Sequence, residues 1–109
     1  MTSHMQIQKI YNQYYSVLMA EKDNGYEAEK LHRARTIDYV QPRAAILVAL
    51  SNKYRPFHIG NALKMHHTTI LYHRDRHEGN VMSWNGYDPL YKLAEEVMEK
   101  SFIDGQFVL

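Results

Sequence analysis

The stretch IGNALKMHHTTILYHRDRH, residues 59–77, decides between two interpretations of this chain. Apolar residues at helical spacing lead into a short polar segment, and the stretch also holds four histidines and two adjacent threonines. Two helices joined by a tight turn would form a helix-turn-helix, which places its second helix in the DNA major groove. The crowded histidines could instead bind a metal ion.

The composition is that of one folded domain. The chain has 109 residues, of which 45% are hydrophobic and 23% charged. No apolar run approaches the roughly 20 residues needed to cross a bilayer, and the N-terminus lacks the plan of a signal peptide. Because the chain has no cysteine, disulfides and thiolate metal sites are excluded. We therefore expect a cytoplasmic protein without a membrane partner.

Charge is unevenly distributed, although the net charge is only +1. Lysines and arginines collect in the middle third, whereas most acidic residues lie in 21–29 and 88–99. The basic middle third therefore predicts a surface that binds a negatively charged partner. A mixed, solvated surface is the alternative explanation.

The N-terminal half is predicted to contain three helices. The first spans about 5–22 and is followed by a turn at 23–25 and a short helix at 26–35. A third helix is predicted at 42–52, with Pro42 in its first turn. The buried stripe of the first helix comprises Ile7, Ile10, Tyr11, Tyr14 and Leu18. The inward residues of the third are Ile46, Ala49 and Leu50.

Two more helices are predicted in the stretch quoted above. The fourth begins at Pro56, and its inward residues are Ile59, Ala62 and Leu63. The fifth begins near His66 and ends where the pattern fades at 79–80. Their short connection predicts a helix-turn-helix.

The C-terminal part is predicted to hold a loop at 81–87, a sixth helix and a hairpin. The sixth helix is capped by Asp88, has Pro89 in its first turn and ends at about Lys100. Its apolar stripe comprises Leu90, Leu93, Ala94, Val97 and Met98. An Asp-Gly turn within 102–109 predicts the hairpin.

Three segments resemble one known family in their order and spacing. They are IQKIYNQYY at 7–15, YVQPRAAILVAL at 39–50 and IGNALKMHHTTILYH at 59–73. Together they are similar to the C-terminal DNA-binding domain of the bacterial replication initiator DnaA, over about residues 6–78. We therefore expect a helix-turn-helix domain at 1–80 and a C-terminal extension with an amphipathic helix at 81–109.

The resemblance implies both a fold and a function. The fold would be all-α, a DnaA C-terminal or Trp-repressor-like helical bundle with a helix-turn-helix, to which this chain adds a C-terminal helix. The function would be sequence-specific binding of double-stranded DNA by a small stand-alone replication or transcription regulator, of a phage or mobile-element type. The chain has no G-x-x-x-x-G-K-[ST] motif, so the ATPase part of the initiator is missing. We expect no enzymatic activity and no cofactor.

The resemblance also implies which residues contact DNA. Arg43 matches an arginine that enters the minor groove, where narrow A·T-rich stretches attract a guanidinium. His67, Thr68 and Thr69 match the N-terminus of the recognition helix, which reads base edges in the major groove. His66 stands where the family usually has an acidic residue. Because a histidine N–H donates where a carboxylate accepts, we expect a different base preference.

The helical wheel of the fifth helix adds further candidates. Ile70 and Leu71 mark its core side, and His67 falls toward that side. The predicted exposed face comprises Thr68, Thr69, Tyr72 and Arg76. Candidate phosphate contacts are Lys53, Arg55, Arg74 and Arg76.

Three of the histidines are candidate metal ligands. His66, His73 and His77 would share a face of one continuous helix, and the last two could bind an ion as an i, i+4 pair. No carboxylate lies at an obvious third-ligand spacing. We therefore expect no metal site, and we expect His73 and His77 to be half-buried or to face phosphate.

A second class of function stays open. The chain could be a protein-interaction module that keeps the fold and binds a protein partner, or a second copy as a homodimer, through the C-terminal helix. Trp84, Tyr87 and Tyr91 flank that helix and would either anchor a partner or pack the helix on the bundle. Salt dependence separates the classes, because phosphate contacts weaken steeply with salt.

Overall fold

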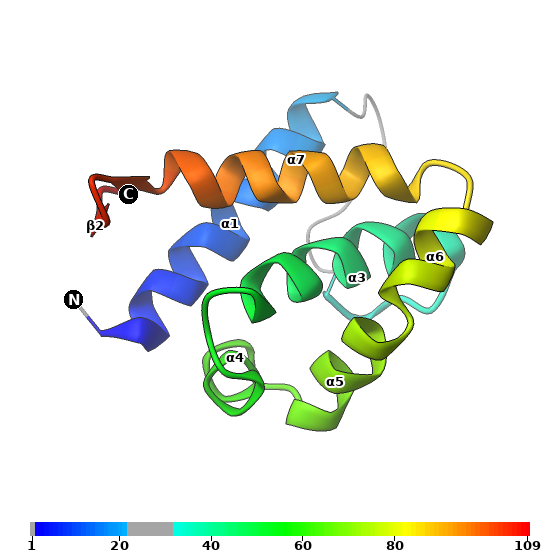
Figure 1. The fold of residues 1–109 in the computed structure, drawn as a ribbon, viewed down its shortest axis with the longest axis horizontal. Helices are drawn as coiled ribbons and strands as arrows, with labels where there is room; N and C mark the ends of the chain where they lie inside the picture. The colour runs from blue at the N-terminus through cyan, green and yellow to red at the C-terminus, as the bar shows by residue number, and fades with distance from the viewer. Residues whose placement is uncertain (1, 22–31) are drawn as a thin grey trace.

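The computed structural model describes residues 2–21 and 32–109, and this part of the chain is an all-α helical bundle with one small hairpin. The elements are α1 (Ser3–Glu21), α3 (Ile37–Ser51), α4 (Pro56–Leu63), α5 (His67–Asp75), α6 (His77–Ser83), α7 (Tyr87–Lys100), β1 (Phe102–Ile103) and β2 (Gln106–Phe107) (Figure 1). The turn predicted at 23–25 and most of the helix predicted at 26–35 lie outside the described residues.

Helix α3 is the centre of the bundle. It contacts α7 on one side, α4 and α5 on the other, and α1 as well (Figure 1). Every residue from Ala44 to Leu50 is buried. The predicted inward residues are thus confirmed, but the burial extends around the whole helix because neighbours cover it on several sides.

The predicted start of α3 was wrong. The helix begins at Ile37, so Pro42 lies inside it and not in its first turn. Thr36 has the extended backbone of an N-cap residue, with φ −71° and ψ 148°, and Asp38 places a carboxylate in the first turn, where the helix dipole favours it. Packing of the buried residues that follow outweighs the one backbone hydrogen bond that a proline removes.

Helix α1 confirms its predicted stripe. All five residues of that stripe are buried and belong to the same core as the inward residues of α3 and α4. Two tyrosines also fix the helices by hydrogen bonds. The Tyr14 hydroxyl donates to the Leu90 carbonyl at 3.4 Å, and the Tyr54 hydroxyl donates to Oε1 of Gln6 at 2.8 Å.

The predicted fifth helix is two helices in the structure. α5 ends at Asp75 and α6 begins at His77, with Arg76 at φ −96° and ψ 0° between them. The pair at 79–80 therefore lies within α6, and the predicted loop at 81–87 shortens to 84–86. A tertiary contact lies next to the break between α5 and α6: Nδ1 of His77 is 2.8 Å from the Tyr87 hydroxyl at the start of α7.

Helix α7 packs its apolar stripe on α3 and α1. Its N-cap is Gly86 at φ 85°, so the helix starts one residue before the predicted cap at Asp88. Ala94 and Val97 are buried, and the rest of the predicted stripe is partly buried against the same core. Tyr87 is fully buried against Ala44 and Ala45, with Trp84 and Tyr91 packed beside it. These aromatic residues therefore hold α7 on the bundle.

The C-terminal hairpin is confirmed. Strand β1 pairs antiparallel with β2, with Phe102 opposite Phe107. Asp104 at φ 52° and Gly105 at φ 80° form the turn, and two successive positive φ angles are typical of a type I′ hairpin. Among the described residues, no helix combines the length and apolar character that a membrane span requires.

Candidate nucleic-acid interface

The connection between α4 and α5 is a tight turn that depends on Gly60. Lys64 has left-handed backbone angles, φ 57° and ψ 47°, and the Met65 N–H donates to the Gly60 carbonyl at 2.9 Å. A Cβ on Gly60 would lie 2.6 Å from the Met65 carbonyl oxygen and 3.2 Å from the His67 nitrogen. Only glycine therefore lets the turn lie this close to α4, which sets the position of α5.

His66 caps the N-terminus of α5. The Thr68 backbone N–H donates to Nδ1 of His66 at 3.2 Å, and the Thr68 hydroxyl lies 2.7 Å from the same nitrogen. Because an N–H can only donate, Nδ1 is unprotonated and the neutral ring carries its hydrogen on Nε2. The Thr68 hydroxyl then also donates to Nδ1. His66 therefore keeps one N–H donor, and Thr68 keeps an oxygen that can accept.

The outer face of α5 is close to the one predicted. Thr68, Tyr72 and Arg76 are exposed, whereas Thr69 is half-buried. The Arg76 guanidinium lies over the Tyr72 ring, 4.3 Å from its centroid, which holds the charge against the helix surface. On the inner side Ile70 is fully buried.

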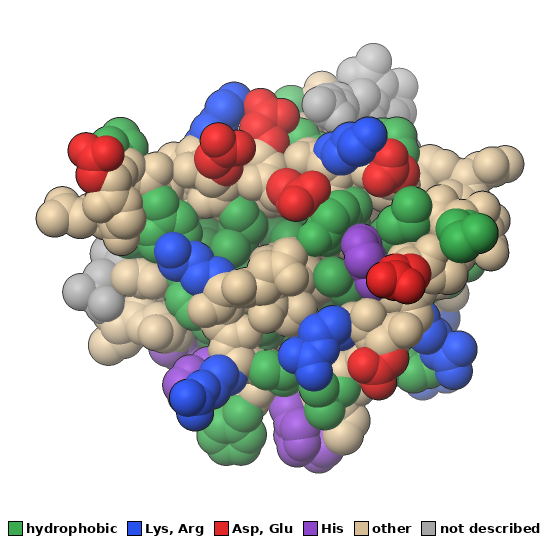
Figure 2. Space-filling view, in the orientation of Figure 1, with side chains coloured by type: hydrophobic (Ala, Val, Ile, Leu, Met, Phe, Trp, Pro, Cys, Tyr) green, Lys and Arg blue, Asp and Glu red, His purple; other side chains and the backbone are tan. Residues whose placement is uncertain are grey.

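The surface around this helix is basic. From Tyr39 to Arg74 the sequence has no aspartate or glutamate, and it has five lysines and arginines. In Figure 2 histidines and basic residues gather along the lower edge, over α4 and α5, whereas most acidic side chains lie in the upper half, along α7. Two ion pairs lie in α7, whereas within 2–21 and 32–109 none involves Arg55, Lys64 or Arg74.

The remaining predicted residues lie outside α5. Arg55 is the exposed residue before α4. Lys53 lies over the Phe102 ring, 3.6 Å from its centroid, and so sits beside the C-terminal hairpin. Arg43 is half-buried in α3, where its charge acts on Tyr11 of α1 and on His73 of α5. The structure therefore places Arg55 before α4, Lys53 beside the C-terminal hairpin and Arg43 in α3, beneath α5.

Two residues at this face were not among the predicted candidates. Phe57 in the first turn of α4 is 60% exposed, and its ring centroid lies 6.1 Å from that of His67. Lys64 is exposed in the turn itself. A signal for Phe57 was present, because the residue falls outside the apolar stripe of its helix.

The two histidines predicted to share a face as an i, i+4 pair lie in different helices. His73 belongs to α5 and is buried, whereas His77 belongs to α6 and is half-buried. Burial, helped by the charge of Arg43, lowers the pKa of His73 to about 4. The expectation of a half-buried residue thus holds for His77 and was wrong for His73. Among the described residues, no three His, Asp or Glu side chains are grouped so that they could hold a metal ion.

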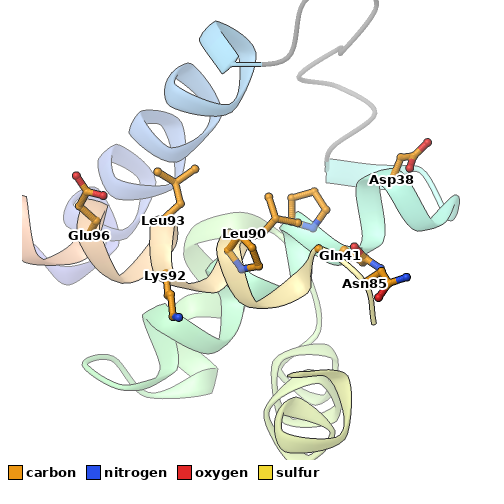
Figure 3. A pocket seen from close by; sticks show the side chains of 10 residues that line it. Asp38, Gln41, Asn85, Leu90, Lys92, Leu93 and Glu96 are labelled. Atoms are coloured by element: carbon orange, nitrogen blue, oxygen red, sulfur yellow. The ribbon is translucent and has the colours of Figure 1, made fainter. Parts of the chain in front are cut away.

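A cavity of about 700 Å³ lies between α3 and the start of α7. Figure 3 shows Asp38, Gln41 and Asn85 at one end of it, with Leu90, Lys92, Leu93 and Glu96 along α7. Two carboxylates at its edge make it a poor match for phosphate. The cavity is therefore not part of the candidate interface.

No family model, curated protein or solved structure matches the chain.

Proposed function

We propose that this chain binds double-stranded DNA in a sequence-specific way, with α5 in the major groove. The observation that carries the proposal is the outer face of α5. The N-terminus of α5 presents two short threonines and a histidine N–H. The exposed basic side chains of this helix have no acidic partner among the described residues. The turn at Gly60 holds the helix beside α4. These are the features that a helix needs to approach base edges closely.

The proposed contacts fall into two groups: some read the base sequence, and the others orient the protein on the duplex. The Nε2 hydrogen of His66 suits an acceptor such as N7 or O6 of guanine, whereas the Thr68 oxygen suits a base amino group. The threonine methyl groups suit the methyl group of thymine. Arg55, Lys64 and Arg74 supply charge to phosphates, which fixes orientation without reading sequence.

The resemblance to the DnaA domain supports the same arrangement. It places the base-reading residues at the N-terminus of α5 and adds Arg43 as a minor-groove contact. By the same resemblance, we propose a regulator of replication or transcription, of a phage or mobile-element type, that is cytoplasmic and not an enzyme.

The alternative of a protein partner on α7 has less support. An exposed apolar face on α7 would favour it, but Leu90, Leu93 and Val97 pack against the core. The outer face of this helix carries charged residues that pair with one another.

The proposal is tested by selecting bound sequences from random duplex DNA. The selected and a scrambled duplex are then titrated at several salt concentrations. We expect a preferred site and an affinity that falls steeply with salt. A protein that enriches no sequence, or whose binding is insensitive to salt, would contradict the proposal.

A further inference from the structure

A row of aromatic rings, exposed at both ends and half-buried in the middle, lies beside the N-terminus of α5. Phe57 lies next to His67, and the His67 ring stacks on that of His66 with 4.5 Å between centroids. We call Phe57, His67 and His66 the aromatic row. Because His66 also caps Thr68, the row continues directly into the base-reading end of α5. Single exposed apolar residues are ordinary on protein surfaces, but this ring belongs to a cluster at the candidate interface.

Folding does not explain the phenyl ring at position 57. The buried residues of α4 are Ile59, Gly60, Ala62 and Leu63, and they face α1, α3 and α5. Phe57 precedes this stripe and keeps 60% of its surface in water. A smaller side chain there should leave the core unchanged.

The chemistry of the ring selects one partner group on DNA. A phenyl ring neither donates nor accepts a hydrogen bond, whereas base edges in the major groove consist of donors, acceptors and the thymine methyl group. The methyl group is therefore the match for Phe57. The two histidines of the row differ, because their nitrogens can bond to polar edges.

We propose that Phe57 packs on the 5-methyl group of a thymine in the bound duplex and so determines part of the sequence preference. The inference rests on the proposed function and adds to it a residue of α4 and the base that this residue recognises. Phe57 would contact a thymine next to the bases that Thr68 and Thr69 read.

The test removes the methyl group from the DNA and the ring from the protein. The probe is the duplex selected from random DNA, with each thymidine replaced in turn by deoxyuridine. Affinities are measured for the wild type, for Phe57→Ala and for Met82→Ala, a control that removes an apolar side chain 88% exposed on α6. Thermal unfolding of the three proteins confirms that the substitutions leave the fold intact.

For the wild type we expect deoxyuridine to weaken binding about fourfold, the factor for one buried methyl group, at a position where Phe57→Ala removes the loss. Met82→Ala should show the same loss, and Phe57→Ala should bind both duplexes equally. If Phe57→Ala keeps the full loss, or if no position affects the wild type, the methyl contact is wrong while DNA binding stands. If the wild type prefers no duplex, the proposed function fails as well.

Discussion

Helices α5 and α7 both pack on α3, but their exposed basic side chains differ in ion pairing. In α7 both lysines pair with an acid one turn away: Lys92 lies 3.0 Å from Asp88, and Lys100 lies 2.7 Å from Glu96. In α5, Arg74 forms no ion pair among the described residues, and Arg76 lies over a tyrosine ring. Helix α7 thus has an acidic surface on which both lysines are paired, whereas basic charge without ion pairs beside short polar side chains leaves a surface for an anionic partner.

The largest expected difference between the two helices is in the pH dependence of stability: low pH should destabilise the packing of α5 more than that of α7. The pKa of His73 under α5 is lowered to about 4 from 6.5, mainly by burial. The unfolded chain therefore binds this proton at a higher pH, so the stability that the neutral ring provides is complete above the unfolded pKa and falls as the pH decreases toward 4. We expect a loss of about 3 kcal/mol at pH 4, from urea unfolding at a series of pH values.

The variant His73→Leu isolates this effect. It removes the titrating ring and should lose most of the pH dependence between about 6.5 and 4. The exposed pairs of α7 should contribute little over the same range. Equal pH dependence in the variant and the wild type would show that the buried histidine is not responsible.

Two glycines provide a matched test of the turn. Gly60→Ala places a Cβ 2.6 Å from a backbone oxygen, so the turn must move, and we expect a loss of roughly 1 to 3 kcal/mol. Gly79→Ala in α6 meets nothing within 4 Å and should be neutral or stabilising by up to about 1 kcal/mol. Thermal unfolding measures both. If the two variants behaved alike, the close approach at Gly60 would not matter for the fold.

Arg43 tests whether the interface extends beyond α5. If its guanidinium enters the minor groove, Arg43→Ala should weaken duplex binding by roughly 1 to 3 kcal/mol, mostly on sites with A·T-rich flanks. Titrations with A·T-rich and G·C-rich flanks measure the effect. Unchanged affinity on every duplex would restrict this half-buried arginine to its contacts within the bundle.

Single surface charges on the two helices should differ by a smaller amount. Arg76→Ala should weaken all duplexes alike and reduce the salt slope by about one, if this arginine touches a phosphate. Lys92→Ala in α7 breaks an exposed pair, which should cost roughly 0.3 to 0.5 kcal/mol of stability and leave duplex binding unchanged. Salt titrations of both variants check this. Equal effects on the slope would mean that α5 has no special role in phosphate binding.

Local patterns predicted much of this structure. The stripe of α1 and the Asp-Gly hairpin depend on residues close in sequence, and the start of α5 at His66 was predicted from its own segment. The outward Thr68, Tyr72 and Arg76 followed from the same helical geometry.

What local patterns missed depends on contacts between distant residues. The break at Arg76 has no glycine or proline to mark it, and it accompanies a contact between His77 and Tyr87. The burial of His73 requires α3 to lie beneath α5, which periodicity in α5 alone does not show. The proximity of Phe57 to His67 likewise exists only once the turn at Gly60 has brought α4 and α5 together.

The most direct test of the central claim replaces both threonines at the N-terminus of α5. Thr68→Ala with Thr69→Ala should weaken binding to the preferred duplex by roughly 1 to 3 kcal/mol per lost base contact. Binding to a scrambled duplex, and its salt slope, should stay nearly unchanged, because phosphate contacts remain. Titration of both duplexes at several salt concentrations measures the difference. If the double variant weakened both duplexes equally, or neither, α5 would not be the helix that reads sequence.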